Sequence, residues 1–252
     1  PPFHYADQPY FDKRGNWNFF VEFGRQSENW PWDKTAWPPD WKRFPEYWRI
    51  GASSRFAIMH TPIRWASVHG DARPELFYAD RFGQRHLSQR DYNLNVIDIS
   101  NPEAAKQYVA DCRRFYETGW DEPWKGWHGP NDEYIPFGRE DNYAVIENER
   151  TQGMLHLDGP KYGVMSDVMA QFYLWLAEAV KRELPGKKVA GWSYANYRLP
   201  PQKAWTYPDN YEHMHCHGES LPVLVDKKVM DYELQILKEW RARVKKPIWV
   251  YW

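Results

Sequence analysis

Short apolar runs alternate with longer amphipathic segments along most of the chain, and this alternation restricts the possible folds most strongly. The clearest amphipathic segment spans 167–184, where apolar residues recur every three or four positions. Pro185 and Gly186 end it, and the strand-like run 188–193 follows directly. Strands that alternate with helices build a parallel sheet, because each helix returns the chain to the start of the next strand. The sequence therefore predicts an α/β fold.

The predicted elements keep this alternating order. Strands are expected over 55–59, 95–99, 124–128, 188–193, 211–217 and 247–252, and helices over about 102–118, 167–184 and 228–244. Ser100 or Asn101 caps the first helix, Pro102 takes its first position, and Gly119 follows its end. The expected buried face of the last helix consists of Met230, Leu234, Leu237, Trp240 and Val244.

A (β/α)8 barrel of the TIM type, possibly truncated at one or both ends, fits this pattern best. Polar and aromatic residues follow the strands repeatedly, and barrel enzymes carry their chemistry at those strand ends. The barrel domain is assigned to residues 48–252, with 1–47 as an irregular N-terminal segment that packs on it. A doubly wound sheet is the alternative, although no glycine-rich phosphate loop follows a strand.

Charge and hydropathy exclude several classes of partner. The formal net charge is -1 and the basic residues are dispersed, so no nucleic-acid partner is expected. No apolar run reaches the ~20 residues needed to span a bilayer. Cys112 and Cys216 form no CxxC motif, so a zinc knuckle is not indicated, and whether they pair stays open. No cofactor motif is present. Because the chain lacks an initiator Met and ends on a strand-like run, we expect a fragment of a longer protein.

Aromatic residues are unusually abundant, with 16 Trp, 17 Tyr and 12 Phe. Many lie in polar, proline-rich surroundings, such as the segments 30–32 and 37–41. Trp and Tyr combine a flat apolar face with a polar group, so they suit stacking on sugar rings. The alternative is that they pack loops and core.

Adjacent carboxylates at Asp132 and Glu133 follow the predicted strand 124–128 and the turn residues Gly129 and Pro130. A pair of carboxyl groups is the minimum equipment for acid–base cleavage of a glycosidic bond. The alternative is a turn in which Asn131 or Asp132 caps its own backbone. Asp132 and Glu133 are the candidate catalytic residues.

Other polar and aromatic side chains at or near strand ends are candidates for binding a sugar. They are His60, Arg64, Trp65, Asn131, Trp192, Tyr194, Asn196, His215 and Tyr251. His60 could instead be hydrogen-bonded inside a turn. Three alternating histidines, His213, His215 and His217, with Glu212 and Glu219 nearby, also permit a metal-dependent hydrolase. A polar barrel lining is the favoured interpretation of these histidines, and no metal is predicted.

Several short motifs, in their order and spacing, resemble those of one family. They are Phe56–Pro62, Arg73–Phe77, Asp80–Arg85, Ile99–Glu103, Pro130–Asp132 and Ser193–Asn196 with Pro200. The family is the domain of unknown function 4838, which includes glycoside hydrolase family 163, the endo-β-N-acetylglucosaminidases of complex N-glycans. Members often carry a cysteine-rich cluster after the Pro-Asn-Asp motif, whereas Glu133–Pro136 follows here. The resemblance runs from about residue 48 to 252, and it implies a TIM-barrel glycosidase that is periplasmic, at the cell surface or secreted.

The resemblance implies a retaining glycoside hydrolase that uses its substrate's own acetamido oxygen as the nucleophile. Asp132 would orient the acetamido group and Glu133 would protonate the leaving oxygen. Glu212 and Glu219 are reserve carboxylates, and the partner is an oligosaccharide or glycan. The alternatives are a glycan-binding barrel without catalysis, an α-glucuronidase-like glycosidase, and the metal-dependent hydrolase.

Overall fold

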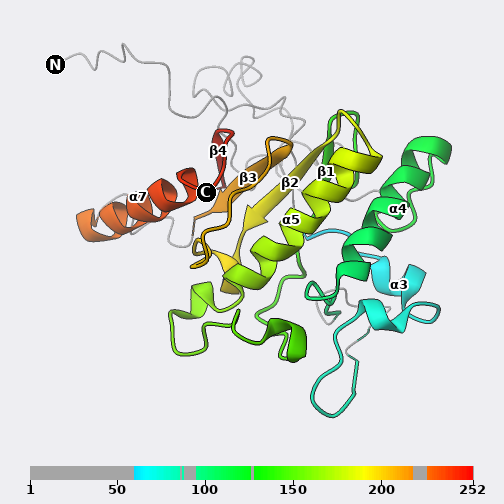
Figure 1. Ribbon diagram of the computed structural model, residues 1–252, viewed down its shortest axis with the longest axis horizontal. Coiled ribbons are helices and arrows are strands. Elements are labelled where there is room, and N and C mark those ends of the chain that lie inside the picture. The colour runs from blue at the N-terminus through cyan, green and yellow to red at the C-terminus, as the bar shows by residue number, and fades with distance from the viewer. Residues whose placement is uncertain (1–59, 86, 88–94, 126–127, 218–225, 252) are drawn as a thin grey trace, which may run out of the picture.

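A computed structural model describes residues 60–85, 87, 95–125, 128–217 and 226–251. At its centre lies a four-stranded parallel sheet with the order β1-β2-β3-β4 (Figure 1). The strands are β1 Tyr134–Pro136, β2 Lys188–Ser193, β3 Tyr211–Cys216 and β4 Ile248–Tyr251. The α-helices are α3 Trp65–His69, α4 Pro102–Thr118, α5 Ser166–Glu183 and α7 Lys227–Arg241, and short 3-10 turns include η7 Ala195–Tyr197.

Local signals in the sequence explain where helix α4 begins and ends. The Asn101 side chain accepts a hydrogen bond from the backbone N–H of Glu103, and Pro102 occupies the first turn, where its missing N–H costs no bond. Gly119 ends the helix in the left-handed conformation, with φ of 73°. The predicted helix is confirmed here, as are α5 and strand β2.

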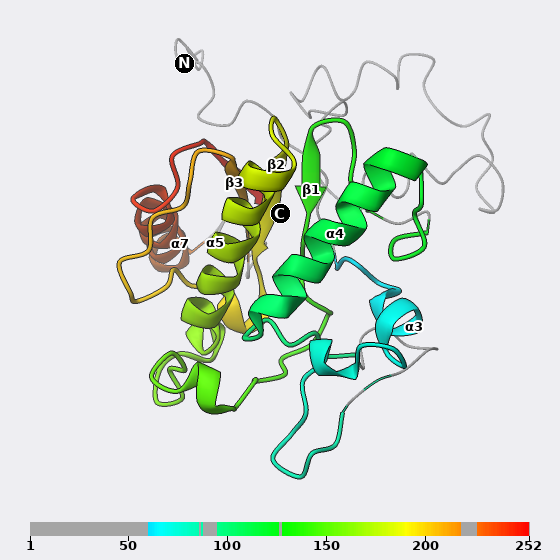
Figure 2. The ribbon, with the colours of Figure 1, turned by 45° about the vertical axis from the view of Figure 1, so that its right-hand side comes forward.

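Helices α5 and α7 cover the same face of the sheet. The Tyr173 hydroxyl of α5 donates to the Phe137 carbonyl (2.9 Å) and accepts from the Trp192 N–H (3.0 Å). Gly191 permits this approach, because a Cβ there would lie 2.8 Å from the Tyr173 ring. His213 of β3 is the register partner of Gly191, so its side chain lies on the same face of the sheet. The His213 ring stacks on Trp240 of α7, with ring centroids 4.0 Å apart. Figure 2 shows α4 beside α5, with which it packs.

The strand order follows the chain order without a reversal. In a doubly wound sheet the order reverses at a switch point, whereas a barrel adds each strand beside the previous one. The described strands form an open parallel sheet, so the closed barrel stays a prediction. The predicted strand 55–59 and the N-terminal segment 1–47 lie outside the described residues. Within those residues, none of the helices has the length and apolar character to cross a bilayer.

Three local predictions are wrong. Trp124 and Lys125 lie in a turn instead of a strand, and the Trp124 ring is buried because it packs against α4, where its Nε1 donates to the Tyr108 hydroxyl (3.2 Å). Residues 95–99 form only an isolated bridge, between Phe77 and Ile97. Trp240 of α7 and Val244 beyond it are buried as predicted, but Glu233 and Ile236 are buried in place of Met230 and Leu234, which are exposed.

A buried carboxylate on the other face of the sheet joins all four strands. Glu212 of β3 accepts from Lys188 Nζ of β2 (2.9 Å), from the Tyr134 hydroxyl of β1 (3.1 Å) and from Trp249 Nε1 of β4 (3.2 Å). Because both carboxylate oxygens accept hydrogen bonds, the cost of burying this charge is offset. Glu212 therefore fixes the register of the sheet toward its amino end.

Buried histidines predict that stability falls in mild acid. Burial lowers the pKa of His213 well below its ordinary value and also lowers the pKa of His215. The unfolded chain binds protons near pH 6.5 and the folded chain does not, so the free energy of unfolding decreases as pH falls below about 6.5. Each group contributes at most about 1.4 kcal/mol per pH unit. Urea unfolding at pH 7.5, 6 and 5 measures this slope, which His213→Phe should reduce; a free energy independent of pH would contradict the expectation.

Candidate active site

Polar side chains gather at the carboxyl end of the sheet, where parallel α/β folds bind their ligands. Arg139, Glu140 and Asp141 follow β1, and Tyr194 follows β2. Thr61 exchanges both backbone hydrogen bonds with Gly138, at 2.8 and 3.1 Å, and this pairing brings the neighbouring His60 to the same place. We call His60, Glu140, Asp141, Trp192 and Tyr194 the carboxyl-end cluster.

Three rings of this cluster pack together. Trp192 and Tyr194 are stacked, with centroids 4.9 Å apart and planes 17° apart. The His60 ring meets both edge-on, at 4.9 and 5.2 Å. Trp192 is only 2% exposed, so its ring stabilises the cluster, whereas Tyr194 is partly exposed and can contact a ligand.

Asp141 supplies the exposed carboxylate of the cluster. Its side chain is 49% exposed, and its Oδ1 accepts a hydrogen bond from the Tyr194 hydroxyl at 2.7 Å. His60 Nε2 lies 3.8 Å from the same oxygen. An exposed carboxylate with one oriented oxygen can bind sugar N–H or O–H groups.

Glu140 supplies a second, buried carboxyl group. Its Oε1 accepts from the Ile97 N–H (3.0 Å), whereas Oε2 lies 3.7 Å from Arg139 Nε and makes no hydrogen bond to the described residues. Burial raises the pKa of Glu140, although the nearby Arg139 and the Ile97 N–H oppose this rise. A raised pKa is the property that a general acid needs near neutral pH.

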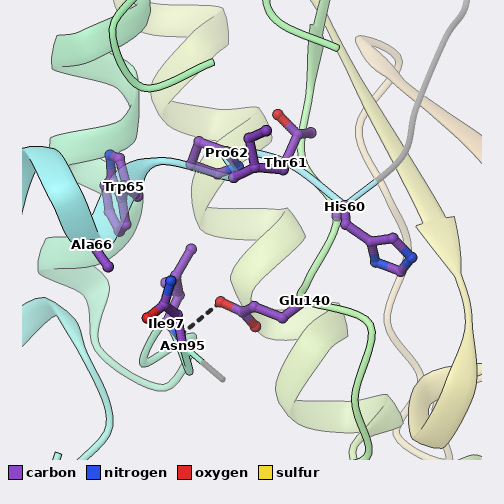
Figure 3. A pocket seen from close by; sticks show the side chains of 10 residues that line it. His60, Thr61, Pro62, Trp65, Ala66, Asn95, Ile97 and Glu140 are labelled. Atoms are coloured by element: carbon purple, nitrogen blue, oxygen red, sulfur yellow. Dashed lines mark hydrogen bonds between the residues drawn. The ribbon is translucent and has the colours of Figure 1, made fainter. Parts of the chain in front are cut away.

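A pocket lies beside Glu140 (Figure 3). Its cavity volume is only about 10 Å³, about the space of one water molecule, and its walls are mainly apolar. The lining residues are His60, Thr61, Pro62, Ile63, Trp65, Ala66, Asn95, Ile97, Gly138 and Glu140. In Figure 3 the Glu140 side chain extends toward Ile97, while the His60 ring points away from it. The space beside the Glu140 carboxyl is therefore large enough for one water molecule.

His60 is neutral near pH 7, since burial lowers its pKa more than the Arg139 carbonyl and Asp141 raise it. Its Nδ1 lies 2.6 Å from the Arg139 carbonyl oxygen, which can only accept a hydrogen bond. Nδ1 therefore carries the proton, and Nε2 presents its lone pair on the side of Asp141.

The predicted catalytic pair lies at the opposite end of the sheet. Asp132 and Glu133 precede β1 instead of following a strand. Asn131 Oδ1 accepts from the N–H groups of Glu133 (2.9 Å) and Tyr134 (2.8 Å), which confirms the alternative of a capped turn. Glu133 pairs with Lys188 at 2.7 Å. This geometry favours a structural role for the pair, and its catalytic role stays a prediction.

The other predicted binding residues divide between the cluster and the scaffold. Trp65 donates from Nε1 to the buried Asp111 (2.6 Å), and Arg64 faces Glu122 at 3.6 Å. Asn196 donates to the carbonyls of Tyr143 and Ala144, so it supports the loop that follows Asp141. Tyr251 aligns with Cys216 at the end of β4.

His215 faces the helices instead of the cluster. It lies 2.8 Å from Ser193 Oγ and 3.5 Å from Glu233 of α7. Glu233 also binds Arg198 at 2.8 Å, and these contacts lower its pKa to about 2 although burial opposes the shift. Across the described residues, His, Cys, Asp and Glu form no group of three or more that could hold a metal ion. Glu219 lies outside those residues.

Glu140 and Asp141 are the residues that the sequence interpretation missed. A usable signal precedes them, since the apolar run Tyr134–Phe137 ends at Gly138 and charged residues follow at once. Pro136 obscured it, because proline is rare inside sheets and is tolerated on edge strands such as β1. Comparison with protein-family models, curated proteins and solved structures finds no match for this chain.

Proposed function

We propose that the chain is a glycoside hydrolase, retaining and substrate-assisted, that acts on glycans containing N-acetylhexosamine. The observation that carries this proposal is the sequence Glu140-Asp141 at the carboxyl end of β1, in which a buried carboxyl with a raised pKa precedes an exposed carboxylate. Two carboxyl groups in unlike environments are a common basis for dividing acid and base roles. The resemblance of the sequence motifs to the endo-β-N-acetylglucosaminidase family supports the same reaction class, although it implies Asp132 and Glu133 as the catalytic pair in place of Glu140 and Asp141.

The two carboxyl groups receive different roles in this proposal. Glu140 donates its proton to the glycosidic oxygen, while the substrate's acetamido oxygen attacks the anomeric carbon and the leaving sugar departs. Asp141 accepts the acetamido N–H and so orients the attacking oxygen. Water then opens the cyclic intermediate and gives its proton to Glu140, which restores both groups and retains the anomeric configuration.

The fold that goes with this function is a (β/α)8 barrel of which β1 to β4 form an arc. Sequential strand order and the shared face of α5 and α7 support this proposal. A periplasmic, cell-surface or secreted location follows from the resemblance alone.

An uronic-acid substrate is less well supported. A glucuronide carboxylate needs a cation in the site, and arginine is the usual choice. Arg139 is fully buried and donates to the Ala144 carbonyl (3.2 Å), although its Nε and Nη2 make no hydrogen bond to the described residues. Arg198 binds Glu233, and Arg64 faces Glu122. The exposed Asp141 carboxylate would repel a second carboxylate.

Reducing-end release from a panel of N-acetylhexosaminides, their 2-hydroxy analogues and glucuronides tests the proposal. We expect release from the N-acetyl compounds alone, because only they carry the attacking acetamido oxygen. Asp141→Asn should lower kcat by about 100-fold, as expected for loss of one electrostatic group in the transition state. The exposed Asp158→Asn is the matched control and should keep wild-type rates. Glycan binding without release would favour the non-catalytic barrel, a candidate supported by the partly exposed Tyr194 ring.

A further inference from the structure

We infer that Tyr194 and His60 are positioning residues that hold the Asp141 carboxylate in one orientation over the carboxyl-end cluster. The inference rests on the proposed function, in which Asp141 orients the substrate's acetamido group. The inference assigns a role to two residues that act through Asp141. Because Asp141 follows β1 and Tyr194 follows β2, their contact links the ends of these two strands.

Tyr194 fixes one carboxylate oxygen. Its hydroxyl donates to Asp141 Oδ1 at 2.7 Å, and burial together with this hydrogen bond raises the pKa of the phenol, so it stays a donor over the working pH range. The ring cannot turn freely, because it is stacked on the buried Trp192 at 17° and 4.9 Å. The hydroxyl therefore occupies a position that the core of the sheet determines.

His60 limits the space open to the same carboxylate oxygen by steric contact alone, because its neutral Nε2 has no proton to donate. Its ring is held by the hydrogen bond from Nδ1 to the Arg139 carbonyl and by edge contacts with Trp192 and Tyr194. Nε2 then lies 3.8 Å from Asp141 Oδ1. Within the described residues, the charged or titratable groups that contact the ring include Asp141 and the Tyr194 phenol. The negative charge of Asp141, 3.8 Å from Nε2, raises the pKa of His60.

An exposed aspartate needs such support to orient a substrate. Functional side chains must be held within about 0.5 Å of their productive position, and a displacement of about 1 Å can lower the rate by 100-fold. With its side chain 49% exposed, Asp141 has little packing of its own. Among the described residues, the hydrogen bond from Tyr194 and the adjacent His60 ring restrict its position.

Tyr194→Phe tests the inference, because it keeps the stacked ring and removes only the hydroxyl. We expect kcat to fall by about 10- to 100-fold while KM changes much less, since the loss acts on orientation in the transition state. His60→Gln should also lower kcat. Tyr143→Phe removes an exposed phenol from the same loop and should have no effect. Tyr194→Phe activity within twofold of wild type would overturn the inference.

Titration of His60 by NMR separates this inference from the proposed function. The Nδ1-protonated tautomer is expected, and Asp141→Asn should lower the pKa of His60, because the carboxylate that raises it is lost. If the wild type cleaves no sugar but shows both results, the proposed function fails, whereas the positioning of Asp141 beside His60 is still supported. An unchanged His60 pKa in Asp141→Asn would remove the contact on which the inference depends.

Discussion

Glu140→Gln is expected to lower kcat/KM by about 10²- to 10⁴-fold, the usual contribution of a positioned general acid. Glutamine has nearly the same shape and can still accept the Ile97 N–H bond, but it has no proton to give to the leaving oxygen. The substitution also removes the carboxyl group that lies 3.7 Å from the buried Arg139 Nε, so its effect on folding is measured beside its effect on activity. Reducing-end assays beside circular dichroism measure both effects.

The same substitution at Glu133 is the matched comparison. Glu133 pairs with Lys188 at the amino end of the sheet, so Glu133→Gln should retain most of the activity. If this variant loses turnover and Glu140→Gln does not, the catalytic pair is Asp132 and Glu133, as the sequence motif indicated. The two variants therefore decide between the two carboxylate pairs in one assay.

Glu212→Ala is expected to destabilise the fold by about 3–5 kcal/mol, the range for breaking a buried ion pair by removing one partner. The substitution removes the acceptor for Lys188, Tyr134 and Trp249 at once. It also opens a gap in the centre of the sheet. Urea unfolding at pH 7.5, followed by tryptophan fluorescence, measures the change in free energy.

Glu133→Ala is the control, because Glu133 binds the same lysine from a more exposed position. Partly exposed ion pairs contribute about 0–1 kcal/mol, so this variant should stay close to wild type. Equal losses in both variants would mean that the Lys188 contact, and not the joining of four strands by Glu212, determines the stability.

The sequence predicted elements best where the local signals are strong. Helix α4 has Asn101, Pro102 and Gly119 at its ends, and these residues satisfy or remove backbone groups without help from the rest of the fold. Strand β2 has six residues between a glycine turn and a polar end, and its predicted bounds are confirmed.

Prediction failed where contacts between residues distant in sequence determine which side chains are buried and where a strand forms. Glu233 is buried in α7 because Arg198 and His215, distant in sequence, contact it, so Met230 and Leu234 were wrongly predicted to be buried, whereas Trp240 and Val244 were predicted correctly. Strand β1 is only three residues long and contains Pro136, so no periodicity could reveal it. The residues after β1 were missed for the same reason. Trp192 and Tyr194 lie at the end of β2 as predicted, and His60 contacts both rings, although the strand expected before His60 lies outside the described residues.

The four-strand contact of Glu212 has a consequence for how the chain acquires its structure during synthesis. Tyr134, Lys188 and Glu212 leave the ribosome in that order, and Trp249 follows them only after a further stretch of chain. At ~5–20 residues per second, this delay lasts seconds. During that time Glu212 lacks its partner from β4, and the edge of β3 is unpaired. A ribosome-bound chain halted before Trp249 therefore leaves the edge of β3 open to aggregation and to chaperone binding.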